Sequence, residues 1–133
     1  MTMIGWIGGV RCARLITGAM TMLLVAAVQM VWAKQDVPAV PAEFSKGEAK
    51  FKANCARCHG ERGVGTNQGP PLVHKIYEPN HHGDAAFQRA AASGVRAHHW
   101  QFGDMPRIEG VTPDDVAQIV AYVRWLQRQA GIM

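Results

Sequence analysis

Residues 55–59 read Cys-Ala-Arg-Cys-His, and this stretch decides how the rest of the chain is interpreted. On a helical turn, residues three apart face the same way, so the thiols of Cys55 and Cys58 can reach two groups on one edge of a flat ligand. The imidazole of His59 follows in the same turn and can bind a metal held there. Two cysteines and a histidine at this spacing are the signature of covalent haem attachment.

Other chemistries also use a Cys-x-x-Cys pair. A thiol redox pair is expected beside a βαβ pattern, and no strand pattern occurs in this sequence. A structural zinc site needs four ligands, and after residue 33 there is no second cysteine pair, although histidines could supply two ligands. A disulfide between Cys55 and Cys58 is a third possibility in an oxidising compartment. Haem attachment is favoured, and the other readings stay open.

The first 33 residues have the features of an export signal. Arg11 and Arg14 precede an uncharged run over residues 15–32, and Val-Trp-Ala at residues 31–33 resembles a cleavage site. The alternative is an uncleaved membrane anchor, since about 20 apolar residues span a bilayer. In either case the positive charges stay inside, which predicts that the rest of the chain lies in the periplasm.

The 133 residues have room for one domain. Residues 34–43 contain two prolines and no periodicity, which predicts an extended linker, and the domain is expected over residues 44–133. The formal net charge is +4, and Arg11 and Arg14 account for half of it. So mild a balance does not indicate nucleic-acid binding.

The first helix is expected to begin at Ser45, read as an N-cap with Glu48 three positions on, and to run towards Cys58. Its inward face is formed by Gly47, Phe51 and Cys55. A second helix is expected over residues 85–92, with Asp84 as its cap and Gly94 at its end.

The last helix is the clearest element, with Thr112 as N-cap and Pro113 at the first helical position. Its apolar stripe consists of Val116, Ile119, Val120, Val123 and Leu126. The predicted fold class is therefore all-α, with three main helices and long loops. Such a fold has little helix-to-helix contact for its size, so a large bound apolar group would supply the missing core.

From about residue 44 to residue 129 the chain resembles a small bacterial class I cytochrome c. The resemblance rests on Gly47, Phe51, Cys55, Cys58, His59, Gly60, the Gly-Pro-Pro-Leu stretch at residues 69–72, Met105, Pro106 and Tyr122. It implies a cytochrome c fold wrapped around one haem c, covalently bound through Cys55 and Cys58. It also implies that the first and last helices cross, with Gly47 and Phe51 against Ile119, Tyr122 and Val123.

The same resemblance implies that the carbonyl of Pro70 accepts the second ring N–H of His59, which fixes the imidazole, and that Leu72 packs on the haem. After residue 33 the only methionines are Met105 and Met133. Met105 is the expected sixth ligand, because a thioether favours ferrous iron and blocks the position where oxygen would bind. The predicted metal ligands are thus His59 and Met105. The alternative is that Met105 only fills the core.

Five further histidines flank the second helix: His74, His81, His82, His98 and His99. They are interpreted first as solvated loop residues, some bonding to haem propionates. The alternatives are iron ligation by His98 or His99, and an accessory copper or zinc site. Trp100 is expected to contact a propionate or cover the haem edge, and core packing is an equal alternative.

The sequence predicts a single-electron carrier rather than an enzyme, with unidentified redox proteins as partners and no membrane contact unless the leader is retained. One alternative is a haem subunit of a larger oxidoreductase. Another is a ligand-binding or peroxidase-like cytochrome in which Met105 leaves the iron. Several basic residues surround the attachment site: Lys46, Lys50, Lys52, Arg57 and Arg62. They are interpreted as solvated charges, with docking of an acidic partner as the second reading.

Overall fold

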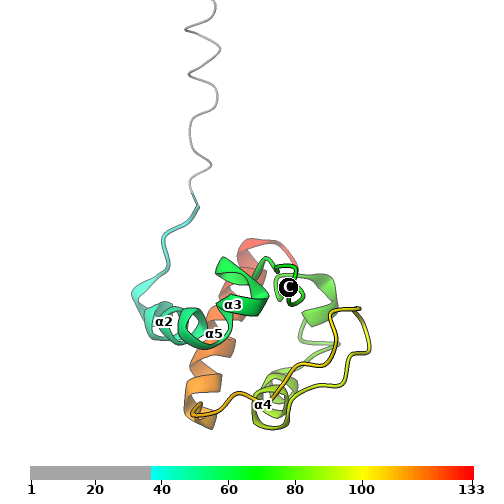
Figure 1. Cartoon of the computed structure of the whole chain (residues 1–133). Helices are drawn as coiled ribbons and strands as arrows, with labels where there is room; N and C mark the ends of the chain where they lie inside the picture. The colour runs from blue at the N-terminus through cyan, green and yellow to red at the C-terminus, as the bar shows by residue number, and fades with distance from the viewer. Residues whose placement is uncertain (1–36) are drawn as a thin grey trace, which may run out of the picture. The chain divides into compact units, whose positions relative to one another are not determined.

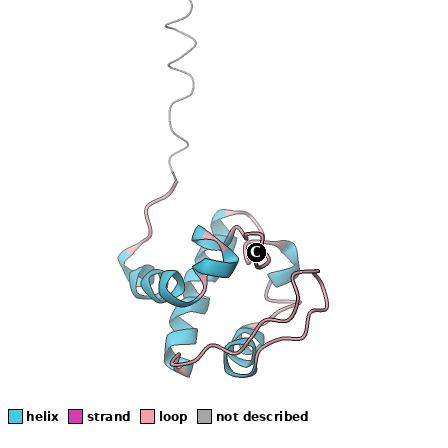
Figure 2. Cartoon of the chain, viewed as in Figure 1, coloured by secondary structure: helices cyan, strands magenta, loops and turns pink. Residues whose placement is uncertain are grey.

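The structure is a computed structural model that describes residues 37–133, so the predicted signal at residues 1–33 lies outside the described residues (Figure 1). Within them the regular elements are all helical, and the only pairing of extended backbone is an isolated bridge between Val95 and Met105 (Figure 2). The all-α prediction is confirmed. In this part of the chain no helix has the length and apolar character needed to cross a membrane.

In chain order the elements are the 3-10 helix η2 (Ala42–Phe44), α2 (Ser45–Asn54), α3 (Ala56–His59), the 3-10 helices η3 (Glu61–Gly63) and η4 (Lys75–Tyr77), α4 (Asp84–Ser93) and α5 (Pro113–Gln129). The chain around Cys55 leaves helical geometry, with φ −121° and ψ −35°, and so separates α2 from α3. The attachment motif therefore lies on its own short turn of helix.

The start of α2 differs from the prediction. Ser45 is not the N-cap, because Phe44 holds that position and Ser45 is the first helical residue. The Ser45 hydroxyl instead donates a 2.7 Å hydrogen bond back to the carbonyl of Ala42. The turn of η2 leads directly into α2, and Phe44 stacks on Trp125 of α5 with ring centroids 5.9 Å apart. A local turn with a tertiary contact has replaced the expected capping box.

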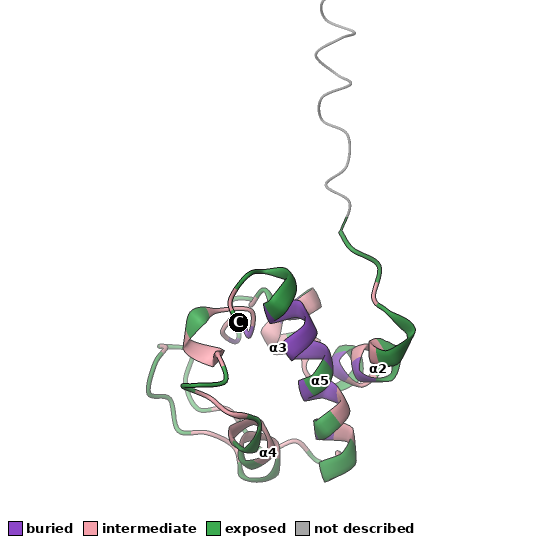
Figure 3. Ribbon diagram, turned by 180° about the vertical axis from the view of Figure 1, so that it is seen from behind, coloured by how far each residue is buried: buried purple, intermediate pink, exposed green. Residues whose placement is uncertain are grey.

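The helices α2 and α5 cross where the resemblance places them. A Cβ atom on Gly47 would lie 2.1 Å from the carbonyl oxygen of Gln118, so only glycine allows this approach. Phe51 and Tyr122 are fully buried at the same crossing, with ring centroids 5.6 Å apart. Figure 3 shows that the buried residues are concentrated on α2 and α5. The core of the domain is this crossing.

The helix α5 begins as predicted. Thr112 accepts a hydrogen bond from the backbone N–H of Asp115, and the Asp115 carboxylate accepts one from the Thr112 N–H, which closes a capping box. Pro113 is the first helical residue. The whole predicted stripe is buried: Val116, Ile119, Val120, Val123 and Leu126.

The helix α4 ends at Gly94 as predicted, but its start differs. Gly83 is the N-cap and Asp84 the first helical residue, so the prediction that Asp84 caps the helix is wrong. The Asp84 carboxylate instead accepts a 2.9 Å hydrogen bond from Arg124 of α5. Gly94 has φ +76°, and a Cβ atom there would lie 2.5 Å from the carbonyl oxygen of Met105. The segment carrying Met105 is therefore packed against the end of α4.

Candidate functional site

A cavity of about 700 Å³ lies beside α3, α4, α5 and the segment that follows α4. This volume is within the range of small-molecule and cofactor sites, although the domain is small. Its lining includes every residue that the sequence analysis assigned to a cofactor: Cys55, Cys58, His59, Pro70, Leu72, Trp100 and Met105. Side chains up to 50 positions apart in the sequence thus meet around one space.

Both cysteines of the motif are free thiols. Burial raises the pKa of the Cys55 thiol to about 11, and the neighbouring Cys58 adds to this shift. A redox-active Cys-x-x-Cys pair needs the opposite, since its attacking thiol has a lowered pKa that produces the thiolate. The environment of Cys55 therefore disfavours the thiol redox reading.

His59 has one ring nitrogen occupied and one left for a metal. Its Nδ1 lies 2.8 Å from the carbonyl oxygen of Pro70. A carbonyl only accepts, so Nδ1 carries the proton and Nε2 keeps its lone pair. Burial lowers the pKa of His59, and the hydrogen bond to Pro70 partly opposes this shift. The lowered pKa favours the neutral imidazole, and the hydrogen bond to Pro70 favours the tautomer whose Nε2 is free to bind a metal.

The loop after α3 is folded tightly beneath the motif. The hydroxyl of Thr66 donates a 2.6 Å hydrogen bond to the carbonyl of Cys58, and the N–H of Gly65 donates one of 2.6 Å to the carbonyl of His59. A Cβ atom on Gly69 would lie 2.9 Å from the carbonyl oxygen of Cys58. These contacts place the Pro70 carbonyl beside His59.

Met105 and Trp100 reach the cavity from the segment that follows α4. The backbone of Met105 exchanges two 2.9 Å hydrogen bonds with Val95, which fixes its position in an otherwise irregular stretch. The buried Nε1 atom of Trp100 lies near the Tyr77 hydroxyl but makes no well-formed hydrogen bond with it. An unpaired buried donor is costly, and an anionic acceptor in the cavity would satisfy it.

Four of the five flanking histidines come together. The ring centroids of His81 and His99 are 4.9 Å apart, and those of His98 and His99 are 4.4 Å apart. His82 also lies in this group, and it lines the cavity together with His98 and His99. The fifth residue, His74, lies edge-on against Trp100 instead, at 5.1 Å.

Three of the basic side chains near the motif are engaged within the domain. Lys50 forms an ion pair with Asp115 of α5. Lys52 pairs with Glu48 at 2.9 Å, one helical turn away. The guanidinium carbon of Arg62 lies 5.3 Å from the ring centroid of Trp125.

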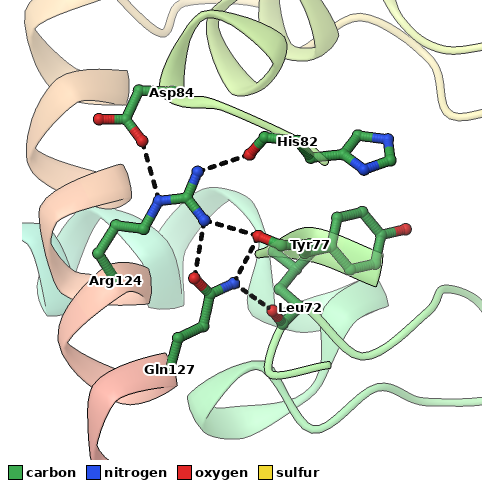
Figure 4. Close-up of polar contacts among 6 residues, drawn as sticks. All are labelled: Leu72, Tyr77, His82, Asp84, Arg124 and Gln127. Carbon is green, nitrogen blue, oxygen red and sulfur yellow. Dashed lines mark hydrogen bonds and ion pairs between the residues drawn. The ribbon is translucent and has the colours of Figure 1, made fainter. Parts of the chain in front are cut away.

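Arg124 and Gln127 were missed by the sequence analysis. Both are buried on α5, and they bind the loop between α3 and α4 (Figure 4). Arg124 donates 2.6 Å hydrogen bonds to the carbonyls of Tyr77 and His82, and Gln127 donates one of 2.8 Å to the carbonyl of Leu72. The helical spacing could have indicated that they are buried, because Arg124 and Gln127 lie four residues after Val120 and Val123 of the buried stripe.

The fold and the site define an all-α domain that attaches a cofactor through a Cys-x-x-Cys-His motif on a short helix. The family model described as "Cytochrome c" matches residues 44–127. This match covers more than half of the chain, so the chain belongs to the cytochrome c family, as a class I c-type cytochrome that binds haem and transfers electrons. No solved structure matches the chain significantly.

The residues present fit the haem c that the family implies. The cavity brings the two free thiols to its wall beside His59, whose Nε2 is available for iron. The buried Nε1 of Trp100 offers a donor for a carboxylate such as a haem propionate. The neighbouring lining is largely apolar, with Leu72, Phe87 and Ile119 among its residues.

Proposed function

We propose that this protein is a periplasmic, mono-haem c-type cytochrome that carries single electrons, with its iron bound by His59 and Met105. The observation that carries the proposal is the arrangement of the cavity, which Cys55, Cys58, His59 and Met105 all line. A single Cys-x-x-Cys-His motif occurs in the chain, so one haem is expected.

Each thiol forms a thioether by adding its sulfur and its hydrogen across one vinyl group, a step that needs no oxidant. Cys55 and Cys58 would hold haem c in this way, and the covalent bonds let a small domain retain it. The Nε2 atom of His59 would bind the iron, while the Pro70 carbonyl accepts the hydrogen bond from Nδ1 and so holds the ring in place.

The sulfur of Met105 is the proposed sixth ligand. The hydrogen bonds to Val95 and the packing against Gly94 fix the Met105 backbone at the wall of the cavity, from which its side chain can reach the iron. A thioether is a soft ligand, which favours ferrous iron and raises the reduction potential.

When bound, the haem supplies a one-electron ferric and ferrous couple, whose potential the protein sets through ligands, burial and hydrogen bonds. The apolar residues that line the cavity would limit the access of water to it. Leu72 is 7% exposed, and Phe51 and Tyr122 are fully buried behind it. If His59 and Met105 both bind the iron as proposed, no open iron position would remain for a substrate, which favours electron transfer over catalysis.

The periplasmic location rests on the predicted signal at residues 1–33. It is tested by fractionating cells that express the full chain and by determining the mass of the protein in the periplasm. A soluble haem protein beginning near residue 34 supports cleavage. A full-length product in the membrane fraction would instead show that residues 1–33 are retained as a membrane anchor.

Haem attachment is tested by denaturing the exported protein and measuring its pyridine haemochrome and its iron content. We expect a c-type haemochrome, one iron per chain, and haem that stays with the polypeptide in acid acetone. The Cys55→Ala variant should shift the haemochrome towards that of a singly attached haem. Haem that is extracted intact from the unmodified protein, or no haem at all, would overturn the proposal.

A further inference from the structure

The loop that precedes α4 and the segment that follows it bring three imidazoles together. His81 and His82 lie in the first of these stretches and His99 in the second. One ligand nitrogen from each ring lies within 4.8 Å of the other two. These three residues take no part in the haem attachment or the iron ligation proposed above.

His82 is held in position at both its ring and its backbone. Its Nδ1 lies 2.7 Å from the carbonyl oxygen of Ile76, so Nδ1 carries the proton and Nε2 keeps its lone pair. The buried Arg124 donates a 2.6 Å hydrogen bond to the His82 carbonyl (Figure 4). A histidine whose second ring nitrogen donates to a carbonyl is the usual form of a metal-binding histidine.

The other two rings are free to adjust. His81 and His99 are exposed, and their ring centroids lie 4.6 Å and 5.2 Å from that of His82. Nitrogens bound to one ion at about 2.1 Å in tetrahedral geometry lie about 3.4 Å apart, so the ligand nitrogens need to approach one another by at most about 1.4 Å. Rotations of two exposed side chains towards a fixed third one can supply this movement.

We propose that His81, His82 and His99 form a second metal site, separate from the haem, for a divalent transition-metal cation that prefers imidazole. The ligand set contains three nitrogens and no oxygen, which excludes calcium and magnesium as the intended ions. Among the cations that imidazole suits, copper binds most tightly and zinc less so. Three protein ligands leave a coordination position for water or for a group from outside.

The site would connect the two stretches that flank α4. His82 and His99 also line the haem cavity, and Trp100 follows His99 directly. A cation bound by all three histidines therefore clamps the segment of residues 95–106 to the loop held by Arg124. Because a cation that binds only the folded form stabilises it by mass action, its binding raises the melting temperature.

The test uses the haem-loaded protein in its ferric form, so that copper cannot take an electron from the iron. Titration with copper(II) or zinc(II) chloride is followed by calorimetry, and the metal content is measured after dialysis. We expect one equivalent of copper or zinc per haem, a higher melting temperature, and nitrogen couplings from imidazole in the copper electron paramagnetic resonance spectrum.

Two variants and a control assign the ligands. His81→Ala and His99→Ala each remove an exposed ring, and we expect each to weaken binding by more than about 100-fold, because losing even an outer partner of a ligand costs about 10–100-fold. His74→Ala removes a histidine outside the cluster and should bind as the unmodified protein does. Absence of stoichiometric binding, or binding that survives both variants, overturns the proposal.

The haem spectrum distinguishes this site from iron ligation. If His99 instead binds the haem iron, His99→Ala changes the ferric absorption spectrum in the absence of any added cation, and the second site is ruled out. An unchanged spectrum combined with lost copper binding supports it. Neither result alters the haemochrome assay, so this proposal and the proposed function can fail independently.

Discussion

The Nδ1 atom of His59 lies 2.8 Å from the carbonyl oxygen of Pro70, on a loop that returns to pack against the motif helix. The return is close at Gly69, where a Cβ atom would lie 2.9 Å from the carbonyl oxygen of Cys58. The hydrogen bond makes the imidazole a more basic ligand, which stabilises the ferric iron. A change in packing at Gly69 would therefore alter the basicity of His59, the proposed iron ligand, through its hydrogen bond to the Pro70 carbonyl.

We predict that Gly69→Ala raises the reduction potential of the holoprotein. The added methyl group pushes the loop away from α3, which weakens the hydrogen bond from His59 to Pro70 and makes the imidazole less basic. Protein film voltammetry measures the potential. Gly47→Ala, which strains the helix crossing instead, should leave the potential nearly unchanged, and an equal shift in both variants would contradict the role of the Pro70 carbonyl.

We predict that Gly47→Ala destabilises the domain by about 1–3 kcal/mol, the usual cost of forcing extra volume into a packed contact. The new Cβ atom would meet the Gln118 carbonyl at 2.1 Å, so α2 and α5 must separate. Urea unfolding of the holoprotein measures the change. Gly83→Ala is the comparison variant and should cost less, because its Cβ would make only an ordinary 3.5 Å contact with the Pro79 carbonyl and the variant loses only a favoured glycine N-cap. Equal stabilities of the two variants would be inconsistent with this crossing.

We predict that Arg124→Met costs about 3–5 kcal/mol, as removal of one partner from a buried charged network does. The substitution leaves the His82 carbonyl and the amide oxygen of Gln127 without their donor, and the Tyr77 carbonyl keeps only its 3.0 Å hydrogen bond from Gln127. Asp84→Asn should cost less than about 1 kcal/mol, since the Asp84 side chain is 71% exposed. Guanidinium unfolding compares the two, and the reverse order would show that the ion pair matters more than the carbonyls.

The environment of the Asp115 carboxyl group predicts that the stability of the folded domain depends on pH. Its hydrogen bonds from Lys50 and from Thr112 lower the pKa of its carboxyl group from 3.8 to about 2. A carboxyl whose pKa is lower in the folded state stabilises that state above the unfolded pKa, and the contribution disappears as the pH falls through the folded pKa. The stabilisation should therefore be complete above about pH 5 and lost between about pH 4 and pH 2.

The matching experiment compares thermal unfolding of Asp115→Asn with that of Asp114→Asn from pH 7 to pH 2. Asp114 lies in the same first turn of α5 but takes no part in the capping box. Asp115→Asn should melt below the unmodified protein at neutral pH and approach it towards pH 2. A deficit that stays constant over this range would rule out the ionised carboxylate as its source.

The elements with local signals could be predicted from the sequence. Thr112, Pro113 and Gly94 mark helix ends through their own backbone chemistry, and the structure contains these ends as predicted. The crossing of Gly47 and Phe51 with α5 was implied by the resemblance to class I cytochromes c.

The features that depend on tertiary contacts could not be predicted. Ser45 and Asp84 are residue types that commonly cap helices. In the structure the Ser45 hydroxyl instead donates to the preceding turn, and the Asp84 carboxylate accepts from the buried Arg124. Arg124 stands out in an apolar stripe, yet its partners are backbone carbonyls that no sequence pattern marks. The grouping of His81 with His99 similarly depends on how two irregular stretches fold on either side of α4.

The central claim is that Met105 and His59 together hold the iron, and the absorption spectrum of the ferric holoprotein tests it most directly. A methionine bound to ferric haem gives a weak band in the red, which we expect in the unmodified protein and in Met133→Ala, where the only other methionine after residue 33 is removed. The band should disappear in Met105→Ala. Its absence from the unmodified protein, or its persistence in Met105→Ala, would contradict the account.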